Sequence, residues 1–317
     1  MRTCYSCETE LTPKNKSEEH VILNACGGRL KSCDLLCAEY NSRFGNSFDF
    51  ELAKNTNTFS NILRIKRERG EPQVIVGKFQ ETGEDALFTS GKNPRLKKPL
   101  VKETRTGNQM HVSIKANDSG ELKKILAGLK RKHPGIDIKK LLENQRKDFI
   151  RKDVGFRVSI GSSNDRKSIT KTAINYFILN KGDRKYISHI VPYLNGETEL
   201  GITWLYYPNE PTYIAKEKEF SHVLKLIGDP EKRMLFCHVE IFNVYNFIAL
   251  LNESYDGKKI DQTYCFDVCE TKLIDDAQVK LEFNVNQLYN SNQSQLQENM
   301  DARLELFLRK ISLFKHP

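Results

Sequence analysis

Residues 19–45 read EHVILNACGGRLKSCDLLCAEYNSRFG, and this stretch decides the fold of the N-terminal part of the chain. Glu19–Leu23 has the composition of a short strand, and Gly27-Gly28 is a tight-turn signal. Asp34 is a good N-cap for a helix that ends near Gly45. The stretch therefore predicts a hairpin followed by a helix.

Cysteines cluster around this stretch. The chain has eight cysteines, and five of them lie within the first 37 residues, beginning with Cys4 and Cys7. Eight are too few for a disulfide scaffold of this length. Such clustering is more typical of a metal site in a protein of the reducing cytosol.

The composition of the whole chain predicts a folded cytoplasmic protein. Its 317 residues are enough for two domains and a small extra module. Hydrophobic residues make up 38% and charged residues 29%, a balance that argues against a largely disordered chain. No run of 18 apolar residues and no basic-then-apolar leader is present, so we expect neither a membrane span nor secretion.

The net charge of +9 comes from one central segment. Residues 61–160 carry 24 lysines and arginines against 12 acidic residues, whereas the flanking segments are slightly acidic. A polyanion is the natural partner of such a segment, because each neutralised phosphate releases condensed counterions. A solvated, lysine-rich surface explains the charge about equally well.

Local patterns outline three regions of an α+β protein without internal repeats. We expect a module at 1–57, a basic region at 58–160 and a mixed α+β region at 161–317. The expected elements beyond residue 58 are helices at 61–69, 119–131, 137–150, 168–179 and 296–314, short strands within 72–115 such as 74–76 and 112–114, and strands at 187–193, 220–228 and 234–251.

The motifs in the first 57 residues resemble those of the HNH endonucleases. The shared elements are Cys4-x-x-Cys7, Glu19-His20, Leu36-Cys37, Asn41 and Phe44-Gly45, in the order of the branch with a Cys-x-x-Cys, Glu-His and Leu-Cys-x-x-Cys-Asn pattern. The resemblance covers residues 4 to about 53. It implies a ββα-metal fold that cleaves nucleic acid.

The resemblance also implies roles for four residues. His20 is the general base, Glu19 and Asn41 are ligands of a catalytic Mg²⁺ or Mn²⁺, and Asp34 orders the loop that orients the histidine. The chemistry suits these types: a neutral imidazole takes a proton from water near pH 7, and carboxylate and amide oxygens are ligands for hard cations.

Strand geometry sets a condition on this assignment. Adjacent strand residues point to opposite faces, so Glu19 and His20 share one metal site only if the strand end is irregular. In the alternative interpretation, Glu19 is a surface carboxylate and His20 a packed histidine of the hairpin.

The zinc half of the motif departs from the family pattern. Cys4, Cys7 and Cys37 match three ligands, but Tyr40 stands at the fourth position, and a phenol is a poor zinc ligand. We expect Cys33 to supply the missing thiolate. A different fourth ligand, such as Cys26 near the hairpin turn, and thiols that pack without metal both stay open.

The basic segment contributes candidate phosphate contacts, and the expected partner is double-stranded DNA. Contacts to phosphate position a protein without specifying sequence, so no target sequence is inferred. The candidates are Arg64, Lys66, Arg67, Arg69, Lys97, Lys98, Lys102 and Arg105.

The sequence thus predicts a metal-dependent endonuclease acting on DNA, and at family level a restriction or anti-phage effector. One alternative is a nucleic-acid-binding protein with a degenerate nuclease motif. Another is a nuclease that stays inactive until its C-terminal region binds a ligand or a protein partner. A homo-oligomer or a protein partner bound through the C-terminal region is also open.

Overall fold

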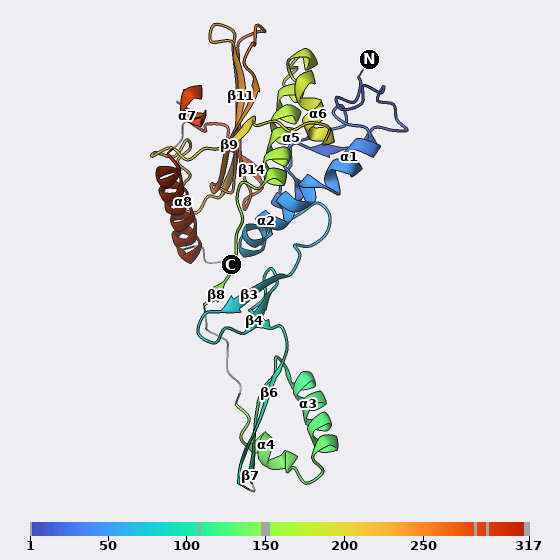
Figure 1. Ribbon diagram of the computed structural model, residues 1–317, viewed down its shortest axis with the longest axis vertical. Coiled ribbons are helices and arrows are strands. Elements are labelled where there is room, and N and C mark those ends of the chain that lie inside the picture. Colours follow the sequence, from blue (N-terminus) through green and yellow to red (C-terminus); the bar gives the residue numbers. More distant parts are fainter. Residues whose placement is uncertain (1, 108, 147–152, 282–283, 290–291, 314–317) are drawn as a thin grey trace. The chain divides into compact units, whose positions relative to one another are not determined.

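The computed structural model describes residues 2–107, 109–146, 153–281, 284–289 and 292–313. The chain forms two compact units. Unit 1 comprises Met1–Pro72 and Val158–Pro317, and unit 2 is the intervening Gln73–Arg157. Helices and mainly antiparallel sheets make up both units (Figure 1), which confirms the predicted α+β class.

The N-terminal part of unit 1 is a hairpin followed by a helix, as the sequence predicts, and then by a second helix that the sequence analysis does not predict. In the hairpin, Glu19 pairs with Ser32 and His20 pairs with Lys31. Gly28 has to be glycine, because a Cβ atom there would lie 1.9 Å from the carbonyl oxygen of Ile22. The elements are β1 (Glu19–His20), η1 (Asn24–Cys26), β2 (Lys31–Ser32), α1 (Ala38–Gly45) and α2 (Phe48–Ile62).

The first helix begins later than the sequence predicts. Its N-cap is Cys37, not Asp34. The reason lies in the backbone before it: the Leu35 carbonyl accepts a hydrogen bond from the Tyr5 amide at 3.1 Å, and Cys37 forms a β-bridge with Lys16. These contacts hold the segment in an extended conformation and anchor it to the N-terminal loop.

Helix α2 passes through the predicted boundary at residues 57–58. Its polar side chains from Thr56 to Asn61 are buried and bonded within the protein, so they do not form a linker. The Thr56 hydroxyl donates to the Leu52 carbonyl at 2.7 Å, and the Ser60 hydroxyl donates to the Ala25 carbonyl at 3.0 Å.

A six-stranded antiparallel sheet with the order β14-β13-β10-β11-β12-β9 occupies the rest of unit 1. Helix α5 lies between this sheet and α2 (Figure 1) and contacts both, so they share one hydrophobic core. Within it, the Phe59 ring lies 5.5 Å from Tyr245 and 4.9 Å from Phe307. The strands are β9 (Thr203–Leu205), β10 (Ser221–Asp229), β11 (Met234–Ile241), β12 (Tyr245–Asn252), β13 (Ile260–Asp267) and β14 (Lys272–Leu273).

The helices of this part are α5 (Ser163–Leu179), α6 (Val191–Asn195), α7 (Val285–Tyr289) and α8 (Gln293–Leu313), with 3-10 turns η2 (Arg184–Tyr186) and η3 (Ser188–Ile190). The predicted helices at 168–179 and 296–314 and the strand at 220–228 are confirmed in substance. The region 234–251 is extended as predicted but forms two antiparallel strands, β11 and β12, because Phe242 and Asn243 adopt left-handed conformations (φ 59° and 58°) that turn the chain. Residue 314 lies outside the described residues. No helix among the described residues has the length and apolar character needed to cross a membrane.

Two local predictions are wrong. The helix expected at 61–69 is absent, because α2 ends at Ile62 and Arg64 adopts a left-handed conformation (φ 53°). The strand expected at 187–193 is instead η3 and the start of α6. Pro192 lacks a strand amide, and Ile190 and Leu194 are buried at a helical spacing.

Unit 2 consists of a small sheet, a long hairpin and two helices. The sheet order is β5-β4-β3-β8, and its core contains Phe79, Ala86 and Leu96. Asp118 caps α3 by accepting from the Glu121 amide at 2.8 Å. The predicted helix at 137–150 is the short α4, and residues 147–150 lie outside the described residues. The elements are β3 (Ile75–Phe79), β4 (Asp85–Phe88), β5 (Arg95–Leu96), β6 (Leu100–Thr106), β7 (Gln109–Lys115), α3 (Ser119–Lys132), α4 (Ile138–Glu143) and β8 (Val154–Gly155).

Candidate active site

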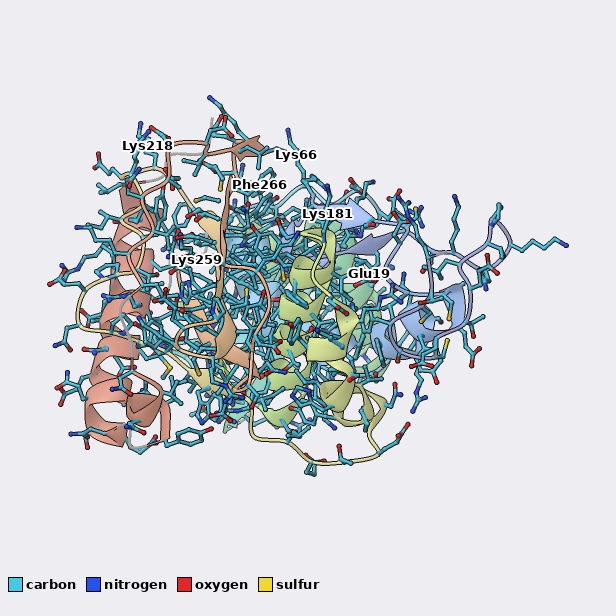
Figure 2. The ribbon with its side chains drawn as sticks, turned by 90° about the horizontal axis from the view of Figure 1, so that it is seen from above. Glu19, Lys66, Lys181, Lys218, Lys259 and Phe266 are labelled. Atoms are coloured by element: carbon cyan, nitrogen blue, oxygen red, sulfur yellow. The ribbon has the colours of Figure 1, made fainter. Side chains whose placement is uncertain are left out.

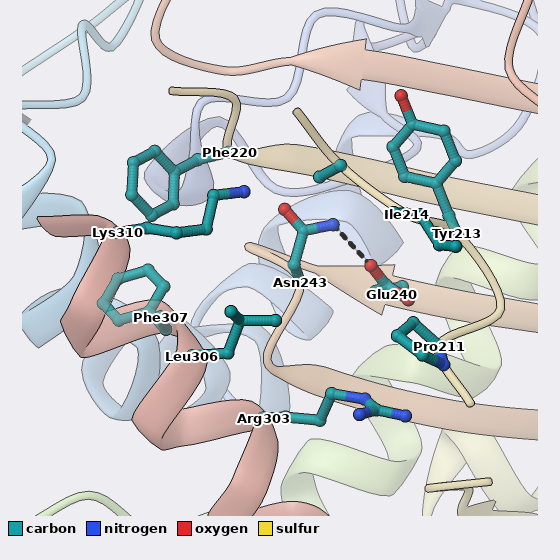
Figure 3. A pocket seen from close by; sticks show the side chains of 11 residues that line it. Pro211, Tyr213, Ile214, Phe220, Glu240, Asn243, Arg303, Leu306, Phe307 and Lys310 are labelled. Carbon is teal, nitrogen blue, oxygen red and sulfur yellow. Dashed lines mark hydrogen bonds between the residues drawn. The ribbon is translucent and has the colours of Figure 1, made fainter. Parts of the chain in front are cut away.

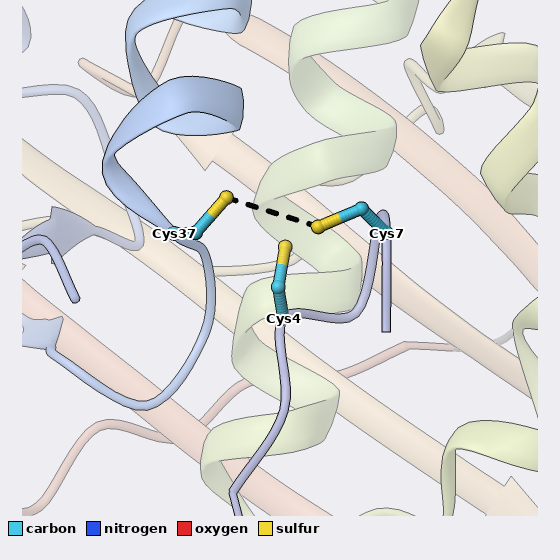
Figure 4. Close-up of side chains that lie close together, drawn as sticks. All are labelled: Cys4, Cys7 and Cys37. Carbon is cyan, nitrogen blue, oxygen red and sulfur yellow. Dashed lines mark hydrogen bonds between the residues drawn. The ribbon is translucent and has the colours of Figure 1, made fainter. Parts of the chain in front are cut away.

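Three of the N-terminal cysteines converge. The thiol sulfurs of Cys4, Cys7 and Cys37 lie within 4.8 Å of one another, and the Cys7 and Cys37 sulfurs are 3.8 Å apart (Figure 4). Zinc–sulfur bonds of about 2.3 Å in a tetrahedron place two sulfurs about 3.8 Å apart. The three thiols therefore fit three corners of a zinc site.

The residues considered for the fourth corner lie elsewhere. Cys33 and Cys26 are not in the group of mutually close ligand atoms found among the described residues. The Cys26 sulfur instead lies 3.2 Å from the Thr56 hydroxyl. The Tyr40 ring packs against Phe44, with centroids 5.9 Å apart. The described residues therefore bring three thiols of a candidate zinc site together, and Cys33 as the fourth ligand stays a prediction.

Glu19 is buried beside α5 (Figure 2). Its carboxylate forms an ion pair with the Lys171 ammonium and accepts a hydrogen bond from the Asn175 amide at 3.0 Å. Burial raises the pKa of Glu19, against the lowering effect of Lys171. The side chain thus faces the protein core.

Lys171 joins the N-terminal module to the core helix through a second carboxylate. Its ammonium lies 2.5 Å from Asp49 of α2, and the Ser168 hydroxyl donates to the same carboxylate at 2.5 Å. Burial alone would lower the pKa of Lys171, but Asp49 and Glu19 raise it overall. The lysine therefore stays charged and balances two buried carboxylates.

His20 points to the opposite, solvent side of the hairpin. Its Nε2 lies 3.1 Å from the Glu68 carboxylate, and 19% of its side chain is exposed. A carboxylate only accepts, so Nε2 carries the proton and Nδ1 the lone pair of the neutral ring. Nδ1 has no hydrogen-bond partner among the described residues. Burial lowers the pKa of His20, although Glu68 opposes this, so the ring is neutral near pH 7.

Glu68 is fixed in place from several sides. Its backbone amide donates to the Asn24 side chain at 2.8 Å, and the Lys31 ammonium lies 3.1 Å from its carboxylate. Lys31 also pairs with Glu18 at 2.6 Å. The hydrogen bond from Lys31 is the main reason that the pKa of Glu68 is lowered. The exposed face around His20 therefore carries Glu18, Lys31 and Glu68.

Of the two remaining predicted site residues, Asn41 lies next to the start of the hairpin, where its amide nitrogen also donates to the Glu18 carbonyl at 3.3 Å. Asn41 donates from its amide nitrogen to the Ser17 hydroxyl at 3.0 Å, and its Oδ1 accepts no hydrogen bond from the described residues. Asp34 pairs with Arg2 at the surface. Among the described residues, no hydrogen bond joins Glu19, His20, Asn41 and Asp34 to one another.

The predicted phosphate-contact residues divide between the two units. Arg64, Lys66 and Arg69 are exposed in unit 1, whereas Arg67 is partly buried and donates to the Asn57 side chain at 3.2 Å. In unit 2, Lys97 pairs with Asp85 at 3.2 Å. The other predicted residues there are also exposed: Lys98, Lys102 and Arg105.

A small cavity of about 60 Å³ lies beside α8, away from the hairpin (Figure 3). The buried Glu240 in its wall accepts from Asn243 at 2.6 Å and from Thr212 at 3.1 Å. Burial raises the pKa of Glu240 to about 7. The nearby Lys310 donates to the Glu219 carbonyl at 2.5 Å. These internal bonds give the polar groups a structural role.

Sequence reasoning missed Glu68 and Lys171. Glu68 is an acidic residue within the basic run Arg64–Arg69, which is a weak signal. Lys171 lies about 150 residues beyond Glu19, and only tertiary packing brings the two together. No local pattern indicates such a contact.

Comparison with known proteins agrees with the location of this site. The family model described as HNH endonuclease matches residues 4–57. No curated protein and no solved structure shows detectable similarity to the chain.

Proposed function

Residues 4–57 are an HNH endonuclease domain, and from this premise we propose that the protein is a metal-dependent endonuclease that hydrolyses phosphodiester bonds of DNA. The observation that carries the proposal is the arrangement of His20, whose Nδ1 faces away from its bond to Glu68 on an exposed part of the domain. A restriction or anti-phage role belongs to the proposal as the family-level expectation.

In the proposed reaction, His20 takes a proton from the attacking water at Nδ1. Glu68 accepts from Nε2–H, so it holds the required tautomer and stabilises the imidazolium that forms. A neutral ring near pH 7 suits this role, in line with the lowered pKa of His20. A bound Mg²⁺ or Mn²⁺ would stabilise charge on the phosphate oxygens.

The predicted metal ligands fit this ion unequally. Asn41 has an amide oxygen without a bond to the described residues, which suits a hard cation. Glu19 has one carboxylate oxygen left for such an ion, because Lys171 and Asn175 both contact Oε1, whereas Oε2 makes no hydrogen bond with the described residues. Withdrawal of Lys171 would free Oε1 as well, and no step above depends on it.

The cysteine cluster has a structural role in this proposal. Cys4, Cys7 and Cys37 would hold a zinc ion that ties the N-terminal loop to the start of α1. A domain with so short a hairpin gains much of its stability from such a metal.

The Glu19–Lys171 pair favours a second candidate function, a gated nuclease. Lys171 belongs to the helix that packs on the C-terminal sheet, so a ligand or partner that moves α5 would release Glu19. The same pair is compatible with a nucleic-acid-binding protein in which the nuclease motif has degenerated.

A cleavage assay with matched variants tests the proposal. The full-length protein should cut plasmid DNA in the presence of Mg²⁺ or Mn²⁺, and His20→Ala should abolish cutting while DNA binding is retained. His189→Ala serves as the control, because this exposed histidine lies outside the domain. Cutting only after addition of cell extract favours the gated nuclease, and binding without cutting under any of these conditions contradicts an active enzyme.

A further inference from the structure

The hairpin of unit 2 has two different faces. Strands β6 and β7 pair along their whole length, so alternate residues point to the same side. On one side, Val112 and Ile114 are partly buried, and Glu103 binds Lys132 at 2.9 Å and His133 at 3.0 Å at the end of α3. Helix α3 lies along the hairpin (Figure 1), and these ion pairs join its C-terminal end to this face.

The other face of the hairpin is exposed and polar. Lys102 lies opposite Ser113, and Thr104 lies opposite His111. All four side chains are exposed, and none has a hydrogen-bond partner among the described residues. We call this set, Lys102, Thr104, His111 and Ser113, the ribbon face.

The net charge of unit 2 indicates which kind of molecule the ribbon face binds. Residues 73–157 carry 20 lysines and arginines against 10 acidic residues, so unit 2 alone accounts for the excess positive charge of the chain. A surface with this potential attracts a polyanion. Short hydroxyl and imidazole groups in such a field are suited to hydrogen bonds with base edges.

We propose that the ribbon face binds in the major groove of double-stranded DNA. The major groove is about 12 Å wide and admits a two-stranded ribbon, whereas the major groove of double-stranded RNA is too narrow for side chains to read. Lys102 contacts phosphate, and Thr104, His111 and Ser113 contact bases. The inference rests on the proposed action on DNA and adds the surface that selects the duplex.

A binding experiment on the full-length His20→Ala protein, which removes the proposed base, tests this inference without strand cleavage. The probe is a fluorescein-labelled DNA duplex of mixed sequence and three helical turns. A triple variant with alanine at Thr104, His111 and Ser113 should bind the duplex about tenfold more weakly or worse. The reason is that the loss of one good base contact already weakens binding by about tenfold. The matched control replaces Thr198, His189 and Ser254, three exposed residues of the same types in unit 1.

Modified probes identify the groove. Glucosylated 5-hydroxymethylcytosine fills the major groove and should reduce binding to the level of the triple variant, whereas a minor-groove ligand such as netropsin should have no effect. Equal binding of the triple and control variants, equal binding of glucosylated DNA, or preference for an RNA duplex overturns the inference.

The two proposals fail in distinguishable ways. If the wild-type protein cuts plasmid DNA but the triple variant binds and cuts as the control does, the ribbon inference fails and the nuclease function stands. If the wild-type protein neither binds nor cuts DNA, the proposed function itself fails.

Discussion

Glu68 is the side chain that holds His20 on the solvent side of the hairpin. It reaches His20 from the segment after α2, outside residues 4–57, and lies 3.1 Å from Nε2. A carboxylate on the second nitrogen of a general-base histidine sets the tautomer and the ring orientation. The group that contacts His20 thus lies outside the residues that the family model matches.

We expect Glu68→Gln to lower the rate of DNA cleavage by about 10- to 100-fold with little change in DNA affinity. Single-turnover cleavage and equilibrium binding measure the two quantities. In a His20→Ala background the same substitution should have no further effect, because Glu68 acts through the histidine.

Glu18→Gln is the matched control for this experiment, since Glu18 also binds Lys31 but makes no hydrogen bond with His20 among the described residues. Equal losses from Glu18→Gln and Glu68→Gln would mean that Lys31, rather than His20, is the group that matters.

At the scale of elements, α5 is what makes the nuclease domain part of a larger core. Its Lys171 lies between Glu19 of the hairpin and Asp49 of α2. Since the three groups are buried, each charge depends on the others for its solvation. Removal of the ammonium leaves two uncompensated carboxylates next to each other.

We therefore expect Lys171→Met to reduce the free energy of unfolding by about 3–5 kcal/mol, as measured by urea denaturation. The triple variant Lys171→Met, Glu19→Gln, Asp49→Asn should recover a large part of this loss, because it removes the unpaired charges as well. A loss that is the same in the triple variant would show that packing, not charge, is responsible. A gain in cleavage by a folded Lys171 variant would support the gated nuclease.

How well the sequence predicts each element depends on how local its determinants are. Cys4, Cys7 and Cys37 are close together in the structure, because a short loop and one β-bridge suffice to place them. The prediction of a strand at 187–193 is wrong, because the spacing of its apolar residues fits both a strand and a helix, and Pro192 favours the start of a helix. The ion pair between Glu19 and Lys171 cannot be predicted from sequence, because only the packing of a helix distant in sequence brings Lys171 next to Glu19.

At the scale of the whole molecule, buried titratable groups make stability depend on pH in opposing ways. Burial lowers the pKa of His222 and of His238 to about 4, so each adds stability as the pH rises from about 4 to 6.5. Burial raises the pKa of Glu240 to about 7. Between about pH 4.5 and 7 the folded state binds the proton that the unfolded state has lost, so this group reduces stability as the pH rises.

We expect Glu240→Gln to be more stable than the wild-type protein at pH 8, by up to about 3 kcal/mol, and to show no gain at pH 4.5. The glutamine can accept from Asn243 and donate to Thr212, as the protonated acid would. Urea denaturation of both proteins at the two pH values isolates this group, because the histidine contributions cancel in the difference. A gain of equal size at both pH values would contradict the raised pKa.

The first and last strands of unit 2 are neighbours in one sheet. Lys78 and Phe79 of β3 pair with Gly155 and Val154 of β8, so the chain leaves and returns at adjacent positions. The ends of the intervening segment therefore lie next to each other, so another segment can join the same two points without rerouting the rest of the polypeptide. The joint therefore provides a place where one segment can be exchanged for another while the sequence of unit 1 stays the same.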